Sequence, residues 1–229
     1  MFHPDDPTTW PLKIPIIAHD VGRTTDRSTA VVGGLRPLLP AKVLGVKQIE
    51  ELPLGLYGTE LANALAEIDQ LYERDCVIVA DLSRDPTYAE VLYDTFGPRI
   101  VGLQIGRSGA GTTFQRWPVR NSAMLVYQVG RTQLFDRLLS DMRAKQVRLK
   151  DGPESSRLYA QLNGLQYEQR DSGMIYSCPS GQHDDLAISV AMLNWAAHHS
   201  HWELWTRPIY DQHRPRRPRQ TFDWGKACT

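Results

Sequence analysis

The sequence predicts an α/β fold built on a mixed central β-sheet. Three runs with strand character come first in the 229-residue chain, and glycine or proline residues separate them. Segments with the apolar spacing of helices then alternate with two short, largely apolar runs. An order of three strands followed by helix, strand, helix and strand is typical of an α/β domain with a mixed sheet flanked by helices.

The three leading runs are expected to pair as an antiparallel meander. They cover residues 14–19, 28–35 and 42–49. The second run is rich in β-branched residues, which pack well on a pleated surface. Gly33-Gly34 and the stretch from Pro37 to Pro40 mark the breaks that a meander requires.

Helices and buried strands are expected to alternate through the rest of the chain. Apolar residues recur at helical spacing in five segments, and short continuous apolar runs are typical of strands buried on both faces. The expected helices cover 58–74, the residues after Pro86, 131–145, the residues after Pro153, and 184–198. The expected buried strands are 76–80 and 100–105, and a hairpin is expected between 166–169 and 174–177.

Composition divides the chain into three parts. Residues 1–11 are expected to be a lead-in or linker, and residues 12–200 a single domain. Within that domain, the segment 106–122 is rich in glycine, serine, threonine and arginine and is expected to be a long loop. Residues 201–229 are expected to be a basic tail rich in proline and arginine. Its segment 213–219 is too polar to build a core and is expected to be extended or disordered.

Charge and cysteine content limit the classes of protein to consider. The formal net charge is zero, so nucleic acid would have to bind at local basic patches. The three cysteines show no CxxC spacing, which argues against a disulfide framework or a zinc site and fits a reducing compartment. No apolar stretch reaches the ~20 residues that span a bilayer, and the N-terminus lacks a signal-peptide pattern. We expect a cytoplasmic protein without a membrane partner.

Four acidic residues stand where a metal site could form. Asp20 and Asp81 end two apolar strand-like runs, and Asp184 and Asp185 open the last expected helix. The two strand ends become neighbours if the strands pair, and the positive end of the helix dipole favours negative charge. Mg²⁺ and Mn²⁺ prefer such carboxylate oxygens. Two ions about 3.5–4 Å apart can activate water and stabilise the leaving oxygen in phosphodiester cleavage.

Each of these acids also has an ordinary structural role when taken singly. Asp184 or Asp185 could be the N-cap of the helix. Asp20 could be a turn residue held by local backbone amides, and Asp81 could start an Asx-turn before Ser83. The order strand–Asp, strand–Asp, helix–Asp-Asp favours a shared metal site over four separate structural roles.

This order resembles the ribonuclease-H-like nuclease domain of viral large terminases, the DNA-packaging enzymes of tailed phages and related gene-transfer particles. The resemblance covers roughly residues 12–200, and 158–162 and the expected hairpin around Gly173 also fit it. The matching motifs are His19-Asp20-Val21-Gly22, Val77-Ile78-Val79-Ala80-Asp81 and, over 181–191, Gly-Gln-His-Asp-Asp-Leu-Ala-Ile-Ser-Val-Ala.

The resemblance implies a ribonuclease-H-like fold and cleavage of double-stranded DNA with two Mg²⁺ or Mn²⁺ ions. By implication, Asp20, Asp81 and Asp185 are catalytic metal ligands, and Asp20 is shared by both ions. Asp184 competes with Asp185 for the third position. His183 is implied to contact the phosphate or a carboxylate, although it also fits an ordinary loop histidine.

Two departures from the family pattern are visible. Many relatives have a glycine-rich turn where this chain continues as Leu82-Ser83-Arg84-Asp85-Pro86. The chain also lacks the Gly-x-x-x-x-Gly-Lys-[Ser/Thr] motif of an ATPase motor, since the glycine-rich segment 106–113 has no lysine. We therefore expect an excised nuclease domain or a separate nuclease subunit, working with an ATPase motor, a portal and a small terminase in the host cytoplasm.

DNA binding requires cations or backbone amides near the metal site. Six arginines are candidates, each of which could equally be a solvated surface charge. The candidates are Arg23, Arg27, Arg107, Arg116, Arg120 and Arg131. The arginines of the tail could add nonspecific DNA affinity or dock on another subunit.

Other functions remain open at this stage. A Holliday-junction resolvase on the same fold also carries acids before an apolar helix. A noncatalytic DNA-binding or assembly module could retain the fold without cutting. A nucleotide-binding module would use the glycine-rich segment 106–113.

Overall fold

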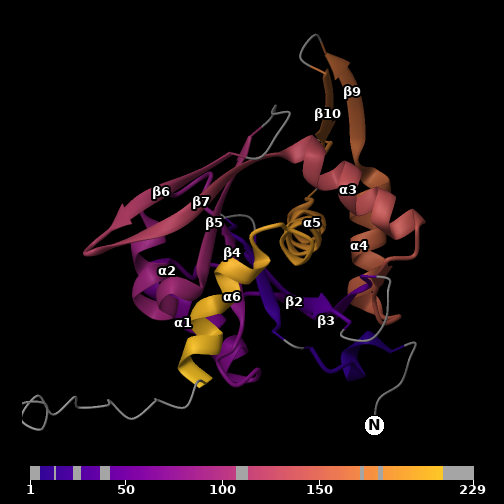
Figure 1. Cartoon of the computed structure of the whole chain (residues 1–229). Helices are drawn as coiled ribbons and strands as arrows, with labels where there is room; N and C mark the ends of the chain where they lie inside the picture. Colours follow the sequence, from indigo (N-terminus) through magenta and orange to yellow (C-terminus); the bar gives the residue numbers. More distant parts are fainter. Residues whose placement is uncertain are drawn as a thin grey trace, which may run out of the picture.

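A mixed eight-stranded sheet runs through the centre of the molecule (Figure 1). The computed structural model describes residues 6–12, 14–22, 27–36, 42–106, 113–170, 173–179 and 183–213. From one edge of the sheet to the other, the strands are β6 (Thr113–Val119), β7 (Ser122–Gly130), β5 (Ile100–Gly106), β4 (Val77–Asp81), β1 (Ile16–Asp20), β2 (Thr29–Leu35), β3 (Leu44–Glu51) and β8 (Val147–Arg148). The expected α/β class with a mixed sheet is confirmed.

Strand pairing brings the ends of β1 and β4 together. The expected meander is confirmed, because β2 pairs antiparallel with both β1 and β3. β4 lies parallel to β1, with His19 opposite Ala80. β5 lies parallel to β4, and β7 lies parallel to β5. Parallel strands end at the same edge of a sheet, so Asp20 and Asp81, the last residues of β1 and β4, reach the same edge.

Helices cover both faces of the sheet and enclose two apolar cores. One core lies under α1 (Gly58–Gln70) and α2 (Tyr88–Phe96). The other lies under α3 (Arg131–Arg143), α4 (Pro153–Gly164), α5 (Asp185–Ala197) and α6 (Trp202–His213). Short 3₁₀ helices occupy Pro7–Thr9 and Gly97–Arg99.

Helix α5 is the central helix of the second core. Every residue from Leu186 to Ala197 is buried, and α5 packs on β1, β2, α3 and α4. A helix that is apolar all round must be buried, and this burial fixes the position of its first turn. The first turn begins with Asp185, so packing carries this acid to the edge of the sheet where β1 ends.

A separate two-stranded hairpin projects beside α3 in Figure 1. It consists of β9 (Gln166–Arg170) and β10 (Gly173–Ser177), as expected from the sequence. The Tyr176 hydroxyl at its base donates a hydrogen bond to Asp136 Oδ1 of α3 at 2.8 Å. The hairpin is therefore tied to the body of the domain at β10.

The expected long loop over 106–122 is wrong for the part that the structure describes. Residues 113–119 form β6 and residues 122–130 form β7, joined by a tight turn. β6 is an edge strand and is mostly exposed, so it lacks the buried alternation that identifies a strand in a sequence. Pro118 is compatible with an edge strand, because the missing N–H costs no interior ladder bond. Residues 107–112 lie outside the described residues.

Both ends of the described chain contribute to the core. The lead-in expected over 1–11 contains Trp10, which is buried where a side chain on Gly45 would clash with its ring. The tail expected over 201–229 begins with α6, whose Trp205 and Ile209 are buried. Pro208 inside α6 obscures this helix in the sequence. Residues 214–229 lie outside the described residues, and the three-part division of the chain stays a prediction.

Candidate metal centre

A cavity of about 680 Å³ opens at the edge of the sheet where β1 and β4 end. All four acids singled out in the sequence line it. Its walls come from strands β1, β4, β5 and β10 and from helices α3 and α5. The lining residues are Asp20, Asp81, Ser83, Arg84, Ile105, Gly106, Arg131, Ile175, Tyr176, Ser177, Cys178, Asp184, Asp185 and Ile188. Three segments far apart in the sequence thus supply the acids of one site.

Asp20 is a buried acid in the lining of this cavity. Its exposed fraction is only 8%. Burial raises the pKa of Asp20 well above its ordinary value, and the nearby charges of Asp81 and Asp185 raise it further. The positive charges of Arg84 and Arg131 act in the opposite direction. A buried carboxylate beside two others is stabilised as an anion only when cations are close, so this environment favours a bound cation.

Asp81 is held in place by its own turn. Burial raises the pKa of Asp81, and hydrogen bonds from Ser83 oppose that shift. The Ser83 backbone N–H donates to Asp81 Oδ1 at 2.8 Å, and the Ser83 hydroxyl donates to the same oxygen. The Asx-turn considered in the sequence is therefore present, and it coexists with a place in the acidic cavity.

Asp184 stands at the N-cap position of α5 but does not cap the helix with its side chain. Its carboxylate forms an ion pair with the Arg131 guanidinium. The backbone N–H of Ala187 in α5 could donate a hydrogen bond to a capping side chain. It donates instead to Gln161 Oε1 of α4, at 2.9 Å. Asp184 is therefore the N-cap residue, as considered in the sequence, but its carboxylate is not the capping acceptor, because α4 supplies that acceptor.

Asp185 is fixed to the meander through its backbone. The Thr29 hydroxyl on β2 donates to the Asp185 carbonyl at 3.1 Å and lies 2.6 Å from the Ser189 hydroxyl. These buried contacts hold the first turn of α5 against β2, next to the end of β1. Asp185 and Asp20 line the same cavity, and the negative charge of Asp185 raises the pKa of Asp20.

Three solved structures are similar to the chain over most of its length. The large terminase nuclease from thermophilic phage G20c matches with a TM-score of 0.56 and 16% identity, over 83% of this chain and 87% of that one. The Thermus phage P74-26 large terminase nuclease domain has a TM-score of 0.51 and 18% identity, over 80% and 78%. The human cytomegalovirus terminase nuclease domain has a TM-score of 0.55 and 12% identity, over 85% and 87%.

The chain has the terminase-nuclease fold. The resemblance that the sequence motifs indicated is confirmed at this level, including the ribonuclease-H-like arrangement of a mixed sheet flanked by helices. No family model and no curated protein sequence matches the chain. Sequence identities of 12–18% indicate a shared fold only, so the chemistry of the site depends on the residues that line the cavity.

Hard divalent cations suit the donors of this acidic cavity. Among the described residues, no three acidic, histidine or cysteine side chains form a ready coordination cage. Mg²⁺ does not need one, because it usually keeps several waters and binds one or two carboxylates together with substrate phosphates. The carboxylate oxygens of Asp20, Asp81 and Asp185, in a cavity with room for water, match that requirement.

The cations of the cavity differ from those expected. Of the four candidate arginines that the structure describes, only Arg131 lines the cavity, where its Nε also donates to the Tyr176 carbonyl at 3.2 Å. Arg116 and Arg27 are exposed elsewhere, and Arg120 pairs with Asp94 at 2.5 Å. Arg23 and Arg107 lie outside the described residues. Sequence reasoning missed Arg84, which its place in the turn after Asp81 could have indicated.

His183 lies at the rim of the cavity. Its Nδ1 is 3.9 Å from Asp185 Oδ2, and its side chain is 56% exposed. This position is compatible with the predicted contact to a carboxylate, which stays a prediction. The sequence did not single out three other residues as site residues: Ser83 and Cys178, which line the cavity, and Gln161, which accepts the N–H of Ala187.

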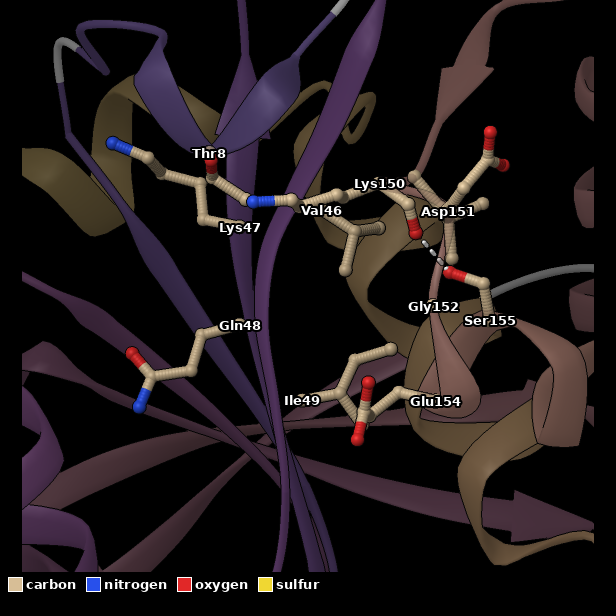
Figure 2. A pocket seen from close by; sticks show the side chains of 11 residues that line it. Thr8, Val46, Lys47, Gln48, Ile49, Lys150, Asp151, Gly152, Glu154 and Ser155 are labelled. Carbon is tan, nitrogen blue, oxygen red and sulfur yellow. Dashed lines mark hydrogen bonds between the residues drawn. The ribbon is translucent and has the colours of Figure 1, made fainter.

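Two other hollows lie away from these acids. One, of about 140 Å³, lies between β3 and the start of α4 (Figure 2). There Lys47 donates to the Trp10 carbonyl at 2.8 Å, and the Ser155 hydroxyl donates to the Lys150 carbonyl. The other, of about 470 Å³, flanks the buried ion pair of Arg99 and Asp69 between α1 and the end of α2. The polar contacts named here hold parts of the fold together.

None of the described helices is long and apolar enough to cross a bilayer.

Proposed function

We propose that this chain is a metal-dependent endonuclease that cuts double-stranded DNA during genome packaging. The observation that carries the proposal is the convergence of Asp20, Asp81 and Asp185 from β1, β4 and α5 in one cavity. The terminase-nuclease fold supports the same reading, since the similar solved structures are described as terminase nucleases. Nuclease chemistry at this site requires no nucleophile from the protein.

Asp20, Asp81 and Asp185 are the proposed ligands of two divalent cations, Mg²⁺ or Mn²⁺. Such ions, when bound, supply activation of a water molecule and neutralisation of charge on the phosphate. Asp20 is the proposed shared ligand, because the charges of both Asp81 and Asp185 act on it. Asp185 is preferred over Asp184 as the third ligand, because the carboxylate of Asp184 is already paired with Arg131.

Arg84 and Arg131 are the proposed phosphate-contacting cations. Both line the cavity, and both lower the pKa values of Asp20 and Asp81 through their positive charge. A DNA phosphate entering the cavity would add negative charge to an acidic site, and these two arginines offset it. Arg131 is oriented by Asp184 and by the Tyr176 carbonyl, so its guanidinium is held in a defined direction.

The proposed partners are duplex DNA, an ATPase motor on another segment or subunit, a portal and a small terminase. The proposed location is the cytoplasm, in the host cell if the chain is viral. These follow from the proposed activity, because cutting during packaging requires a motor that translocates DNA.

Plasmid cleavage tests the proposal directly. Supercoiled plasmid is incubated with the wild type, Asp20→Ala and a control, Glu60→Ala, which alters an exposed acid at the start of α1. With Mn²⁺ or Mg²⁺, the wild type and the control should nick and linearise the plasmid, while Asp20→Ala should not. Calorimetric titration with Mn²⁺ alone accompanies the assay. A wild type that neither cuts nor binds Mn²⁺ contradicts the proposal.

The same assay separates the alternatives. Cleavage of four-way junctions but not of linear or supercoiled duplex would indicate the resolvase-like function. DNA binding without any cleavage, in the presence of bound Mn²⁺, would indicate the noncatalytic module.

A further inference from the structure

We propose that Ser83 is a positioning residue that holds one oxygen of Asp81 and thereby presents the other oxygen to the cation. The inference rests on the proposed metal-dependent function and extends it to a residue outside the acidic motif. Its basis is a set of hydrogen bonds at the point where β4 ends.

Both hydrogen bonds from Ser83 go to the same oxygen of Asp81. The backbone N–H of Ser83 donates to Oδ1 at 2.8 Å, and the hydroxyl donates to Oδ1 as well. Among the described residues, no hydrogen bond reaches Oδ2. A carboxylate that accepts two hydrogen bonds at one oxygen cannot rotate without losing both of them. It therefore offers a cation a single, directed oxygen.

The Ser83 hydroxyl is itself oriented by β5. The backbone N–H of Ile105 donates to Ser83 Oγ at 2.5 Å. The last backbone contact between these strands is Leu82 N–H to the Leu103 carbonyl, at 2.7 Å, so the serine side chain takes the place of the next ladder acceptor. Because Oγ accepts from Ile105, its own hydrogen is left to point at Asp81. The end of β5 thus fixes the Asp81 carboxylate through one hydroxyl.

Outer partners of this kind affect metal sites strongly. Groups that hydrogen-bond a ligating carboxylate orient it, and their removal typically costs about 10–100-fold in metal affinity or activity. Ser83 meets the geometric condition, since both it and Asp81 line the 680 Å³ cavity. An alanine at 83 keeps the N–H contact but removes the hydroxyl from both Oδ1 and Ile105.

The chain contains a matched control four residues further on. Thr87 donates to Asp85 Oδ1 through its backbone N–H at 3.0 Å and through its hydroxyl at 2.5 Å. This is the same pair of contacts, but Asp85 and Thr87 do not line the cavity. The pair also demonstrates that threonine is compatible with such a turn, so Ser83→Thr is a conservative variant that retains the hydroxyl.

The test measures Mn²⁺ binding without DNA. Free Mn²⁺ is followed by its electron paramagnetic resonance signal during titration of the wild type, Ser83→Ala, Ser83→Thr and Thr87→Ala. Plasmid cleavage is then measured over rising Mn²⁺ concentrations, and circular dichroism checks that each variant is folded. We expect about 10–100-fold weaker Mn²⁺ binding for Ser83→Ala. We expect a parallel rise in the Mn²⁺ needed for half-maximal cleavage, and near wild-type behaviour for Ser83→Thr and Thr87→Ala.

Each other outcome overturns a defined statement. If Ser83→Ala binds Mn²⁺ as tightly as Thr87→Ala while the wild type binds and cuts, the role of Ser83 is refuted and the proposed function stands. If Ser83→Thr binds Mn²⁺ as weakly as Ser83→Ala, loss of the hydroxyl does not explain the weaker binding, and the inference is again refuted. If the wild type neither binds Mn²⁺ nor cuts, the proposed function itself fails and the role of Ser83 fails with it.

Discussion

His19 and Asp20 are neighbours on β1 with opposite environments. Successive side chains of a strand point to opposite faces, so Asp20 enters the acidic cavity while His19 enters the core under α2. His19 is fully buried, and its Nδ1 lies 2.9 Å from the Thr29 carbonyl. Burial lowers the pKa of His19 to about 4, whereas burial and like charges raise the pKa of Asp20. The two residues therefore affect stability in opposite directions as pH changes.

Acidification should destabilise the protein through His19. Between pH 6.5 and about 4, the unfolded chain binds a proton at this histidine that the folded chain excludes. The free energy of unfolding therefore falls as pH falls through that window, by an amount on the order of 3 kcal/mol. Urea unfolding at pH 7.5 and pH 4.5 measures this effect. Between the two pH values, the free energy of unfolding should fall less for His19→Asn than for the wild type. Equal losses in both proteins would contradict this assignment.

Replacing Asp20 by asparagine should stabilise the metal-free protein while abolishing cleavage. The raised pKa of Asp20 means that the folded state loses stability as pH rises through that pKa. At pH 8 with EDTA, Asp20→Asn removes this penalty, and Tm should rise by roughly 2–4 °C for each kcal/mol regained. Mn²⁺ should raise the Tm of the wild type, because it binds the folded state, but not that of Asp20→Asn.

Asp151→Asn, which changes an exposed acid away from the cavity, is the control for this comparison. It should leave both the Tm and the effect of Mn²⁺ unchanged. A Tm in EDTA that is lower for Asp20→Asn than for the wild type would contradict the proposed destabilisation of the folded state by the charge of Asp20.

At the scale of elements, the start of α5 depends on α4. Gln161 of α4 accepts the N–H of Ala187 and so performs the capping role that Asp184 leaves open. The Asp184 carboxylate can therefore pair with Arg131 at the cavity wall. Contacts from α4 and from Arg131 of α3 thus hold the acidic first turn of α5 in place.

Gln161→Ala should weaken this arrangement. The unfolding free energy should fall by about 1 kcal/mol, the usual effect of losing a cap. The rate of cleavage should also fall. Without Gln161, the Asp184 carboxylate becomes the nearest acceptor for the Ala187 N–H, so Arg131 loses its ion pair with Asp184. Urea unfolding and plasmid cleavage measure the two effects. Gln161→Glu keeps an acceptor and should retain the stability, and Asn163→Ala, an exposed amide of α4, should change neither.

Elements with regular burial could be predicted from the sequence, and elements at edges could not. The meander, the two buried strands and α1 to α5 follow from apolar spacing, because each presents a continuous face or a continuous run to the core. β6 escaped because an exposed edge strand carries no such alternation. α6 escaped because Pro208 and the neighbouring arginines resemble a tail, although Trp205 and Ile209 bury one side of the helix.

At the scale of the whole molecule, the acidic site was predictable because topology determines it. Strand ends that pair in parallel must share an edge, so Asp20 and Asp81 could be brought together from the sequence alone. The partners of the acids could not be predicted in this way. Gln161 and Arg131 act through side-chain contacts that depend on how separate elements pack, and sequence spacing does not encode that packing. The contact of Ser83 with Asp81 is local and was considered as an Asx-turn, but the bond that orients the Ser83 hydroxyl comes from Ile105 of β5 and also depends on packing.

The charge of the molecule is divided unevenly along the chain. Residues 214–229 hold five of the 26 basic residues and one of the 26 acidic residues. The remaining 213 residues therefore hold 21 basic and 25 acidic residues, a formal charge of −4. An acidic cavity on a negatively charged domain repels DNA phosphates at long range. The basic segment offsets that repulsion, so it should matter for DNA affinity more than for cleavage itself.

Deleting residues 214–229 should weaken duplex binding and reduce its salt dependence. If all five cations contact phosphates, the slope of log K against log salt should become less steep by roughly 4.5, since each contact contributes about 0.9. Fluorescence anisotropy with labelled duplex over a KCl series, in EDTA, measures this slope. Under saturating DNA and Mn²⁺, the cleavage rate should remain close to that of the full chain. A variant with lysine at Arg214, Arg216, Arg217 and Arg219 keeps the charge and should keep the slope. An unchanged slope after the deletion would indicate instead that this segment serves contact with another subunit.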